Sequence, residues 1–171
     1  QLSRGLGDVY KRQDQSLSFY IVDSAFVKMN TIRGDSLNVA GSFGSPIGVG
    51  YLCDFMVISD NEIIESPYMG LTFSDNANRI FAQRNTIYRP GNSGIYLQGS
   101  GKKVVMGNFI VEPNQNSNAS ASTGSGIYGQ SLENTTTLNN LVEVDPTDVK
   151  ALYLLYVFSA SGTNLFAPNY S

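Results

Sequence analysis

The 171-residue sequence predicts an all-β solenoid, a fold in which the chain winds through stacked coils of short strands. Three observations predict this fold. Glycine, serine, asparagine and threonine are abundant, which disfavours helices and suits strands joined by turns. A motif centred on asparagine recurs along the chain, and a second motif that begins with glycine precedes it at a nearly constant distance.

The first motif is an asparagine with an apolar or small residue four positions before it and an apolar residue two positions after it. The intervals between successive asparagines are 31, 24, 23, 32 and 24 residues. Asparagine tolerates the left-handed backbone of a corner, and stacked asparagines can form hydrogen bonds to one another. We therefore expect a structural ladder, not a binding site. Its members are Asn30, Asn61, Asn85, Asn108, Asn140 and Asn164.

The second motif is a glycine followed by alternating side chains, as in Gly94-Ile-Tyr-Leu. Its glycines stand 14 or 15 residues before three successive asparagines of the first motif. A repeat of about 23 residues, with short alternating strands and with Gly or Asn at the corners, corresponds to one turn of a β-solenoid. The glycines are Gly70, Gly94 and Gly126.

The alternation predicts which side chains face the interior. After Gly94, Ile95 and Leu97 are expected to point inward and Tyr96 to point outward. The apolar residues two positions after each asparagine are expected to form an interior stack, in which each large side chain contributes roughly 1.5–3 kcal/mol. That stack would comprise Ile32, Ile63, Ile87, Ile110, Val142 and Phe166.

The domain organisation is simple, because the length is that of one domain with a substantial core. The stretch SRGLGDVYKRQ at residues 3–13 stands apart, since its reverse translation resembles a transposon-based sequencing adapter. We expect residues 1–13 to be an unstructured adapter artefact and residues 14–171 to be a truncated solenoid domain. Small, polar and aperiodic sequence predicts loop insertions near 34–48 and 114–125.

The succession of G-[ILV]-x-[LF] and N-x-[IVLF] over residues 17–166 resembles the repeat of pectin-lyase-like proteins. The resemblance implies a right-handed parallel β-helix, here of about six coils. This fold is shared by polysaccharide lyases, glycoside hydrolases, epimerases, phage tailspikes and adhesins, so it does not select one function.

Composition and charge exclude several functions. The net charge is −3 and the basic residues are not clustered, which argues against a nucleic-acid partner. No apolar run approaches the ~18 residues that a membrane span needs. Histidine is absent and Cys53 is the single cysteine, which excludes His-dependent catalysis within this chain and disfavours a zinc site. We expect no cofactor and no metal, and we expect Cys53 to be a buried, inert thiol.

Outward-facing residues carry the candidate functions. Three charged residues stand four positions after successive asparagines, and they predict either a surface ion-pair ladder or a groove for a charged polymer. Three tyrosines are expected to face solvent, where their rings and hydroxyls suit contact with sugars. The candidate carbohydrate-binding residues are Glu65, Tyr88, Arg89, Tyr96, Glu112 and Tyr128.

No catalytic residue can be assigned, because the acidic residues match no catalytic motif. The possible acids are Asp54, Asp60, Glu62, Glu65 and Asp75, with Arg79, Arg84 and Arg89 as nearby bases. A carboxylate cluster on one face would favour a lyase or glycoside hydrolase. An apolar stripe along all six coils would favour a shaft.

The functional expectation is therefore an extracellular, cell-surface or virion-associated domain that binds or processes polysaccharide. The alternative is the structural shaft of a phage tailspike or adhesin without catalytic activity, which would be a homotrimer if it is a tailspike.

Overall fold

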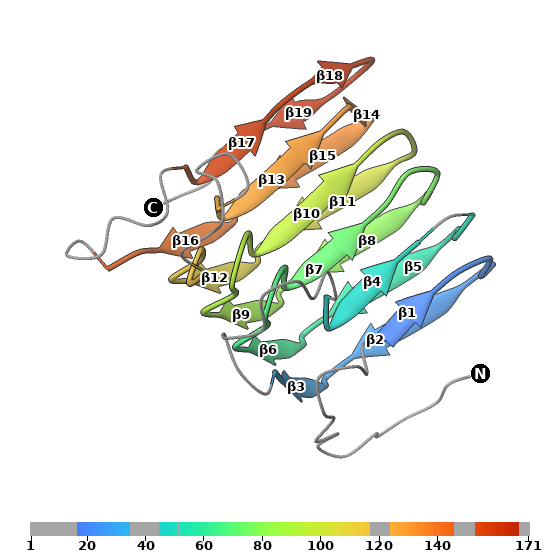
Figure 1. The fold of residues 1–171 in the computed structure, drawn as a ribbon. Coiled ribbons are helices and arrows are strands. Elements are labelled where there is room, and N and C mark those ends of the chain that lie inside the picture. The colour runs from blue at the N-terminus through green and yellow to red at the C-terminus, as the bar shows by residue number, and fades with distance from the viewer. Residues whose placement is uncertain (1–16, 35–44, 51, 117–123, 146–152, 168–171) are drawn as a thin grey trace.

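The computed structural model describes residues 17–34, 45–50, 52–116, 124–145 and 153–167, and this part of the chain forms strands and no helix. The strands stack in parallel, each against the corresponding strand of the next coil, so that three long sheets run along one axis (Figure 1). The predicted all-β, parallel solenoid is confirmed.

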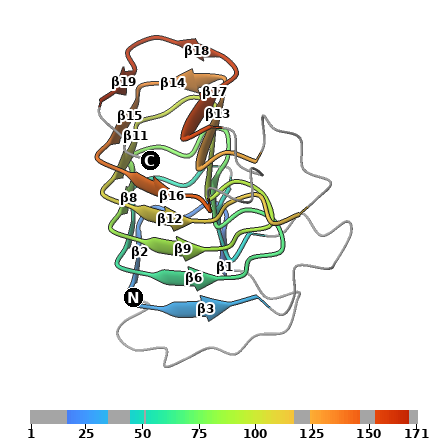
Figure 2. The same ribbon diagram turned by 90° about the vertical axis from the view of Figure 1, so that its left-hand side faces the viewer.

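Each coil passes through the three sheets in the same order. Figure 2 shows the successive coils from the side, with their strands stacked one above another. We name the sheets A, B and C. Sheet A contains β1 (Leu17–Phe19), β4 (Ile47–Val49), β7 (Leu71–Phe73), β10 (Ile95–Gln98), β13 (Ile127–Gln130) and β17 (Leu155–Val157). Sheet B contains β2 (Ala25–Lys28), β5 (Met56–Ser59), β8 (Ile80–Gln83), β11 (Lys103–Met106), β15 (Thr135–Leu138) and β19 (Leu165–Phe166). Sheet C contains β3 (Thr31–Arg33), β6 (Glu62–Ile64), β9 (Thr86–Tyr88), β12 (Phe109–Val111) and β16 (Leu141–Glu143).

The last two coils carry an additional strand pair, and the last of them is incomplete among the described residues. Strand β14 (Leu132–Glu133) pairs with β18 (Ala160–Ser161) between sheets A and B. Among the described residues, the sixth passage contributes to sheets A and B but not to sheet C. The expectation of about six coils is therefore slightly too high.

The loop boundaries also differ from those expected. Strand β4 begins at Ile47, inside the insertion predicted at 34–48, because Ile47 and Val49 occupy inward positions of sheet A. Residues 35–44 and 117–123, the central parts of the two predicted insertions, lie outside the described residues. Residues 1–13, expected to be an adapter artefact, lie outside them as well.

A ladder of asparagine side chains joins the coils at the corner between sheets B and C. In each step, the Oδ1 atom of one asparagine accepts hydrogen bonds from the backbone N–H and the Nδ2 group of the asparagine in the preceding coil, at 2.9–3.1 Å. The members from the second coil onward are at most 2% exposed. The ladder runs through Asn30, Asn61, Asn85, Asn108 and Asn140.

Asn164 does not occupy the ladder position that the motif predicted. Its Oδ1 atom accepts a hydrogen bond from the backbone N–H of Thr135 at 2.9 Å, at the corner that leads into β15. The reason is the register of sheet B, which pairs Phe166 with Thr137 and so places Asn164 before the strand and not after it. Counted along the chain, Asn169 stands as far after Phe166 as Asn140 stands after Thr137, and it lies outside the described residues.

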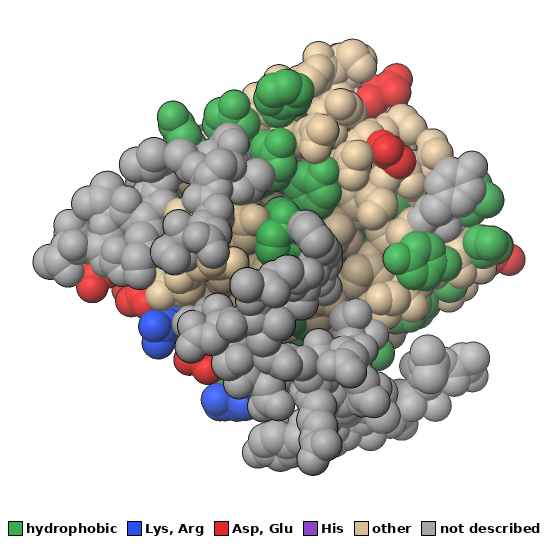
Figure 3. Space-filling view, in the orientation of Figure 1, with side chains coloured by type: hydrophobic (Ala, Val, Ile, Leu, Met, Phe, Trp, Pro, Cys, Tyr) green, Lys and Arg blue, Asp and Glu red, His purple; other side chains and the backbone are tan. Residues whose placement is uncertain are grey.

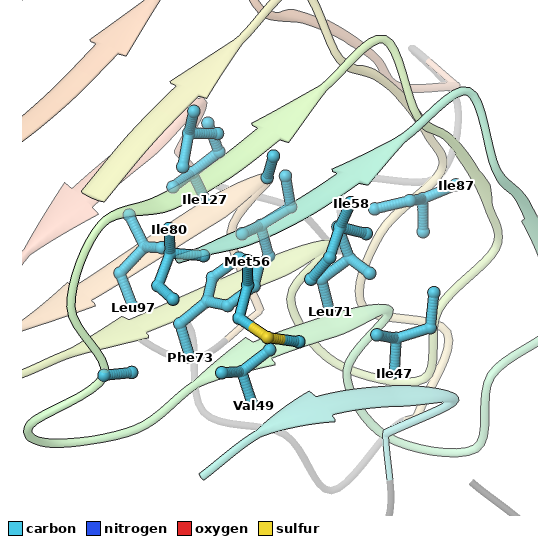
Figure 4. Close-up of a cluster of buried hydrophobic side chains, with 14 of the residues drawn as sticks. Ile47, Val49, Met56, Ile58, Leu71, Phe73, Ile80, Ile87, Leu97 and Ile127 are labelled. Atoms are coloured by element: carbon cyan, nitrogen blue, oxygen red, sulfur yellow. The ribbon is translucent and has the colours of Figure 1, made fainter. Parts of the chain in front are cut away.

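The interior is a set of apolar columns, one residue per coil. Ile63, Ile87 and Ile110 are fully buried and stack in register in sheet C, as predicted. Figure 4 shows inward-pointing side chains from several strands meeting in the core. The predicted sixth member, Phe166, is instead in sheet B and is 40% exposed.

The glycine motif is explained by this packing. A Cβ atom on Gly94 would lie 2.6 Å from Cγ2 of Ile110 and 2.9 Å from the backbone oxygen of Gly126, closer than real Cβ contacts allow. Gly70 stands in the same relation to Ile87. The two sequence motifs therefore recur together because their residues pack against each other.

Two interior residues carry reactive groups. Cys53 is 1% exposed, as predicted, and its Sγ donates to the backbone oxygen of Phe19 at 3.2 Å. Lys103 is fully buried, at an inward position of sheet B. Its ammonium donates to the backbone oxygens of Gly99, at 3.2 Å, and of Ser100. Burial lowers the pKa of Lys103 to about 8, against the opposing effect of Asp75.

Candidate functional site

The outer face of sheet A carries a row of tyrosine side chains. Tyr96, Tyr128 and Tyr156 occupy the same outward position on β10, β13 and β17, and Thr72 precedes them on β7. The row exists because the residue two positions after the motif glycine points away from the core. Along the solenoid axis, the row repeats once per coil, at the strand spacing of ~4.8 Å.

The tyrosine rings stack on one another. The ring centroids of Tyr96 and Tyr128 are 5.3 Å apart with an interplanar angle of 22°, and those of Tyr128 and Tyr156 are 5.8 Å apart at 33°. Tyr153 extends the row, with its ring 5.4 Å from that of Tyr156. These separations are typical of favourable aromatic pairs.

The stacking corrects one expectation. Tyr128 was predicted to face solvent, but it is only 9% exposed because neighbouring rings cover both of its faces. Tyr96 is partly exposed. An outward position on a sheet is therefore not the same as an exposed one when its neighbours in both adjacent coils are aromatic.

The polar atoms of this face are arranged by hydrogen bonds. The Tyr96 hydroxyl donates to Oε1 of Gln130 at 2.8 Å, and the hydroxyl groups of Ser45 and Thr72 are paired. Burial raises the pKa of Tyr96 to about 12, with smaller contributions from Tyr128 and Asp75. The Tyr96 hydroxyl is therefore neutral at physiological pH and can still accept a hydrogen bond.

The strands of sheet A carry no charge. None of β1, β4, β7, β10, β13 and β17 contains Asp, Glu, Lys or Arg. Figure 3 views the molecule in the orientation of Figure 1. Among the described atoms in this view, hydrophobic and uncharged polar side chains predominate, and the basic side chains lie along the lower left edge. This face is thus aromatic, hydroxyl-rich and uncharged.

Three of the candidate residues form a separate cluster of charge. Glu65, Arg89 and Glu112 occupy equivalent corners after β6, β9 and β12. Arg89 lies between the two carboxylates, with Nη1 3.7 Å from Oε1 of Glu65 and Nε 3.3 Å from Oε2 of Glu112. All three side chains are at least 37% exposed, so solvent weakens these pairs. The arrangement has the geometry of a surface ion-pair ladder.

Tyr88 belongs to neither group. It points outward from sheet C, where its ring meets that of Phe109 edge-on at 6.5 Å. The six candidate binding residues thus lie in three places: Tyr96 and Tyr128 on sheet A, Tyr88 on sheet C, and the charged cluster at the corner that follows sheet C.

Most of the possible catalytic acids are engaged in ion pairs. Asp54 is paired with Arg79, and Asp60 accepts two hydrogen bonds from Arg84 at 2.7 and 2.9 Å. In each pair the arginine lowers the pKa of the carboxyl group. The described residues contain no group of three or more His, Cys, Asp or Glu that could hold a metal ion. This geometry therefore gives no reason to assign a pair of these acids to catalysis.

Sequence reasoning missed Tyr156 and Gln130 as members of the sheet A face, and it placed Gln98 on the outside without making it a candidate. The two glutamines could have been found, because they stand two positions after Tyr96 and Tyr128 in the same motif. Tyr156 could not, because the motif spacing of 14 residues before Asn164 places the start of the last repeat at Lys150. The structure instead pairs Leu155 with Ile127, several residues later.

A second distinctive surface lies on the outer face of sheet B. One outward position is apolar in five of six strands, with Thr136 as the exception. The ring of Phe55 lies 5.9 Å from those of both Phe26 and Phe81, which extends the apolar surface across the first coils. We call this surface the sheet B stripe. Its members are Phe26, Phe55, Val57, Phe81, Val104 and Leu165.

None of the described residues belongs to a helix long and apolar enough to span a membrane. No curated protein and no solved structure matches the chain. A family model, the right handed beta helix region, matches residues 11–169, which is most of the chain. Together with the three parallel sheets and the asparagine ladder, this match shows that the chain belongs to the right-handed β-helix family.

Proposed function

We propose that this chain is a polysaccharide-binding domain and that the outer face of sheet A is its binding surface. The observation that carries the proposal is the tyrosine row, with Tyr96, Tyr128 and Tyr156 in register along the axis. A polymer lying along the axis would meet the same groups once per coil. Repetition of this kind suits an extended chain of similar units better than a small molecule.

The recognition would depend on hydroxyl and amide groups more than on ring faces. The faces of Tyr128 are covered by Tyr96 and Tyr156, so sugar rings cannot stack on them. Hydroxyl groups and the carboxamides of Gln98 and Gln130 remain along the edges of the row, and they can donate to and accept from sugar hydroxyls.

We propose binding without catalysis. A glycosidase needs two carboxyl groups across the cleaved bond, at ~5–5.5 Å or ~6.5–9.5 Å. Asp54 and Asp60 are each held by an arginine, and both lie outside the strands of sheet A. Their lowered pKa values make them poor general acids. An extracellular, cell-surface or virion location would fit such a domain.

The test is affinity electrophoresis against a panel of soluble neutral and acidic polysaccharides, followed by calorimetry on any polymer that retards the protein. Tyr96→Phe removes only the hydroxyl that donates to Gln130. We expect it to weaken binding about fivefold, the value of one hydrogen bond. Tyr88→Phe on sheet C is the matched control and should leave affinity unchanged. Equal losses in both variants, or no binding by the unmodified protein, would refute the proposal.

A second candidate function, an oligomeric shaft, is favoured by the sheet B stripe. Phe26 and Leu165, at its two ends, are 54% and 52% exposed. Exposed apolar surface that continues along a solenoid is suited to packing against other copies of the chain, for example in a homotrimer. Sedimentation velocity would test this. An assembly that Phe81→Lys dissociates and Gln83→Lys does not would support a shaft, and a monomer at all concentrations would exclude it.

A further inference from the structure

We infer that the sheet A face selects neutral polysaccharides over acidic ones. This inference rests on the proposed function, and it adds the chemical class of the ligand. It depends on the charges that surround the tyrosine row and not on the row itself.

Among the residues that the structure describes, the face offers no cation to an acidic sugar. Its six strands contain no lysine or arginine, and the outward residues around Tyr96 are Thr72, Gln98 and Gln130. Recognition of a carboxylate or sulfate normally uses the planar fork of arginine or the ammonium of lysine. A polyanion bound here would lose part of its hydration without gaining an ionic partner, which is unfavourable.

The charge that acts on the row is negative. Asp75 follows β7, is exposed, and is close enough to contribute to the raised pKa of Tyr96. The nearest basic residue in the core, Lys103, points into the interior and donates to backbone oxygens, so it cannot meet a polymer on the outside. At the adjoining corner, Arg89 is shared between Glu65 and Glu112, which gives that cluster a net negative charge.

The remaining groups match the chemistry of a neutral sugar. A hydroxyl both donates and accepts, as do the tyrosine hydroxyls, the threonine hydroxyl and the glutamine carboxamides of this face. With pKa about 12, Tyr96 stays a neutral phenol over the whole range in which polysaccharides are normally handled. Binding should therefore vary little with salt, because no ion pair is formed.

The experiment measures affinity for a neutral glucan, a galactan and a mannan, and for polygalacturonate and alginate, at about 50 mM and about 500 mM NaCl. The variant Gln98→Lys places one cation beside the tyrosine row. Its matched control is Gln83→Lys, the same change of charge on the outer face of sheet B. Circular dichroism melting of both variants checks that they fold like the unmodified protein.

We expect the unmodified protein to bind at least one neutral polymer, with a dissociation constant that changes less than about twofold between the two salt concentrations. We expect Gln98→Lys, and not Gln83→Lys, to bind acidic polymers, with an affinity that falls as salt rises. If the unmodified protein instead binds only acidic polymers, and Tyr96→Phe weakens that binding, the proposed function stands and selection of neutral polymers is refuted. If it binds neither class, the proposed function itself fails.

Discussion

Two corners of the coil carry ladders of repeated side chains, and the ladders differ in burial and charge. Between sheets B and C, neutral asparagines such as Asn85 are buried and each donates two hydrogen bonds to the next one in the ladder. At the corner that follows sheet C, Glu65, Arg89 and Glu112 are exposed and interact at 3.3–3.7 Å. Both ladders repeat at the same strand spacing, so the spacing alone does not determine how much a ladder stabilises the fold.

Burial makes the difference. A buried amide that loses its partner cannot turn to water, so each broken bond costs about 1–3 kcal/mol. An exposed charge that loses its partner is solvated, and a surface pair contributes only about 0–1 kcal/mol. We therefore expect the asparagine ladder to hold the coils in register and the charged ladder to add little.

The largest effect should come from Asn85→Ala. Asn85 accepts from Asn61 and donates to Asn108 and to the backbone oxygen of Ile58, so its removal leaves buried groups unpaired in two neighbouring coils. We expect the free energy of unfolding to fall by about 3 kcal/mol or more. Urea denaturation followed by circular dichroism measures it.

Two control substitutions test whether burial causes the effect of Asn85→Ala. Asn30→Ala removes the partly exposed first member of the ladder and should cost less than Asn85→Ala. Asn78→Ala changes an exposed asparagine outside the ladder and should cost less than about 1 kcal/mol. If all three substitutions had similar effects, burial would not be what distinguishes the ladder.

A smaller effect should come from a charge that is buried, namely Lys103. Its pKa is lowered from 10.5 to about 8, so between these values the unfolded chain binds more protons than the folded one. The contribution of Lys103 to stability should therefore rise with pH from about 8 to about 10.5, by about 3 kcal/mol in total, and the raised pKa values of Tyr96 and Tyr128 oppose this rise above about pH 9.5. Denaturation at a series of pH values measures the slope.

Lys103→Met tests the origin of this dependence. The substitution removes the titrating group and keeps an unbranched side chain of similar length, so the rise in stability should disappear. Lys102→Met, beside it but exposed, should leave the rise unchanged. A rise that persists in Lys103→Met would show that another group is responsible.

The sequence was sufficient to predict features that recur in every coil because the packing requires them. The motif placed Asn30 to Asn140 at one corner because every coil needs a buried amide there. It failed at Asn164 because the segment between β16 and β17 is longer than the one between β9 and β10, which shifts the last coil along the chain relative to the motif.

Features that depend on neighbouring side chains were harder to predict. The outward position of Tyr128 followed from alternation, but its burial follows from rings in two other coils. Lys103 stands two positions before the inward Val105, so alternation places it inside, yet only the carbonyl groups of the corner explain how an ammonium is accommodated there.

The smallest effect should come from Arg89→Ala, which removes the centre of the charged ladder. We expect the free energy of unfolding to change by less than about 1 kcal/mol, and the change to vanish at about 500 mM NaCl. Arg89 also has a left-handed backbone, with φ of 49°, a conformation that costs a non-glycine residue about 1–2 kcal/mol.

Arg89→Gly separates the two contributions, because glycine loses the ion pairs but adopts this conformation without strain. We expect Arg89→Gly to be at least as stable as the unmodified protein and more stable than Arg89→Ala. A broken buried hydrogen bond costs about 1–3 kcal/mol. If both variants lowered the free energy of unfolding by a similar amount, about 2 kcal/mol or more, the charged ladder would be as important as the asparagine ladder. Exposure to solvent would then not be the property that separates the two corners.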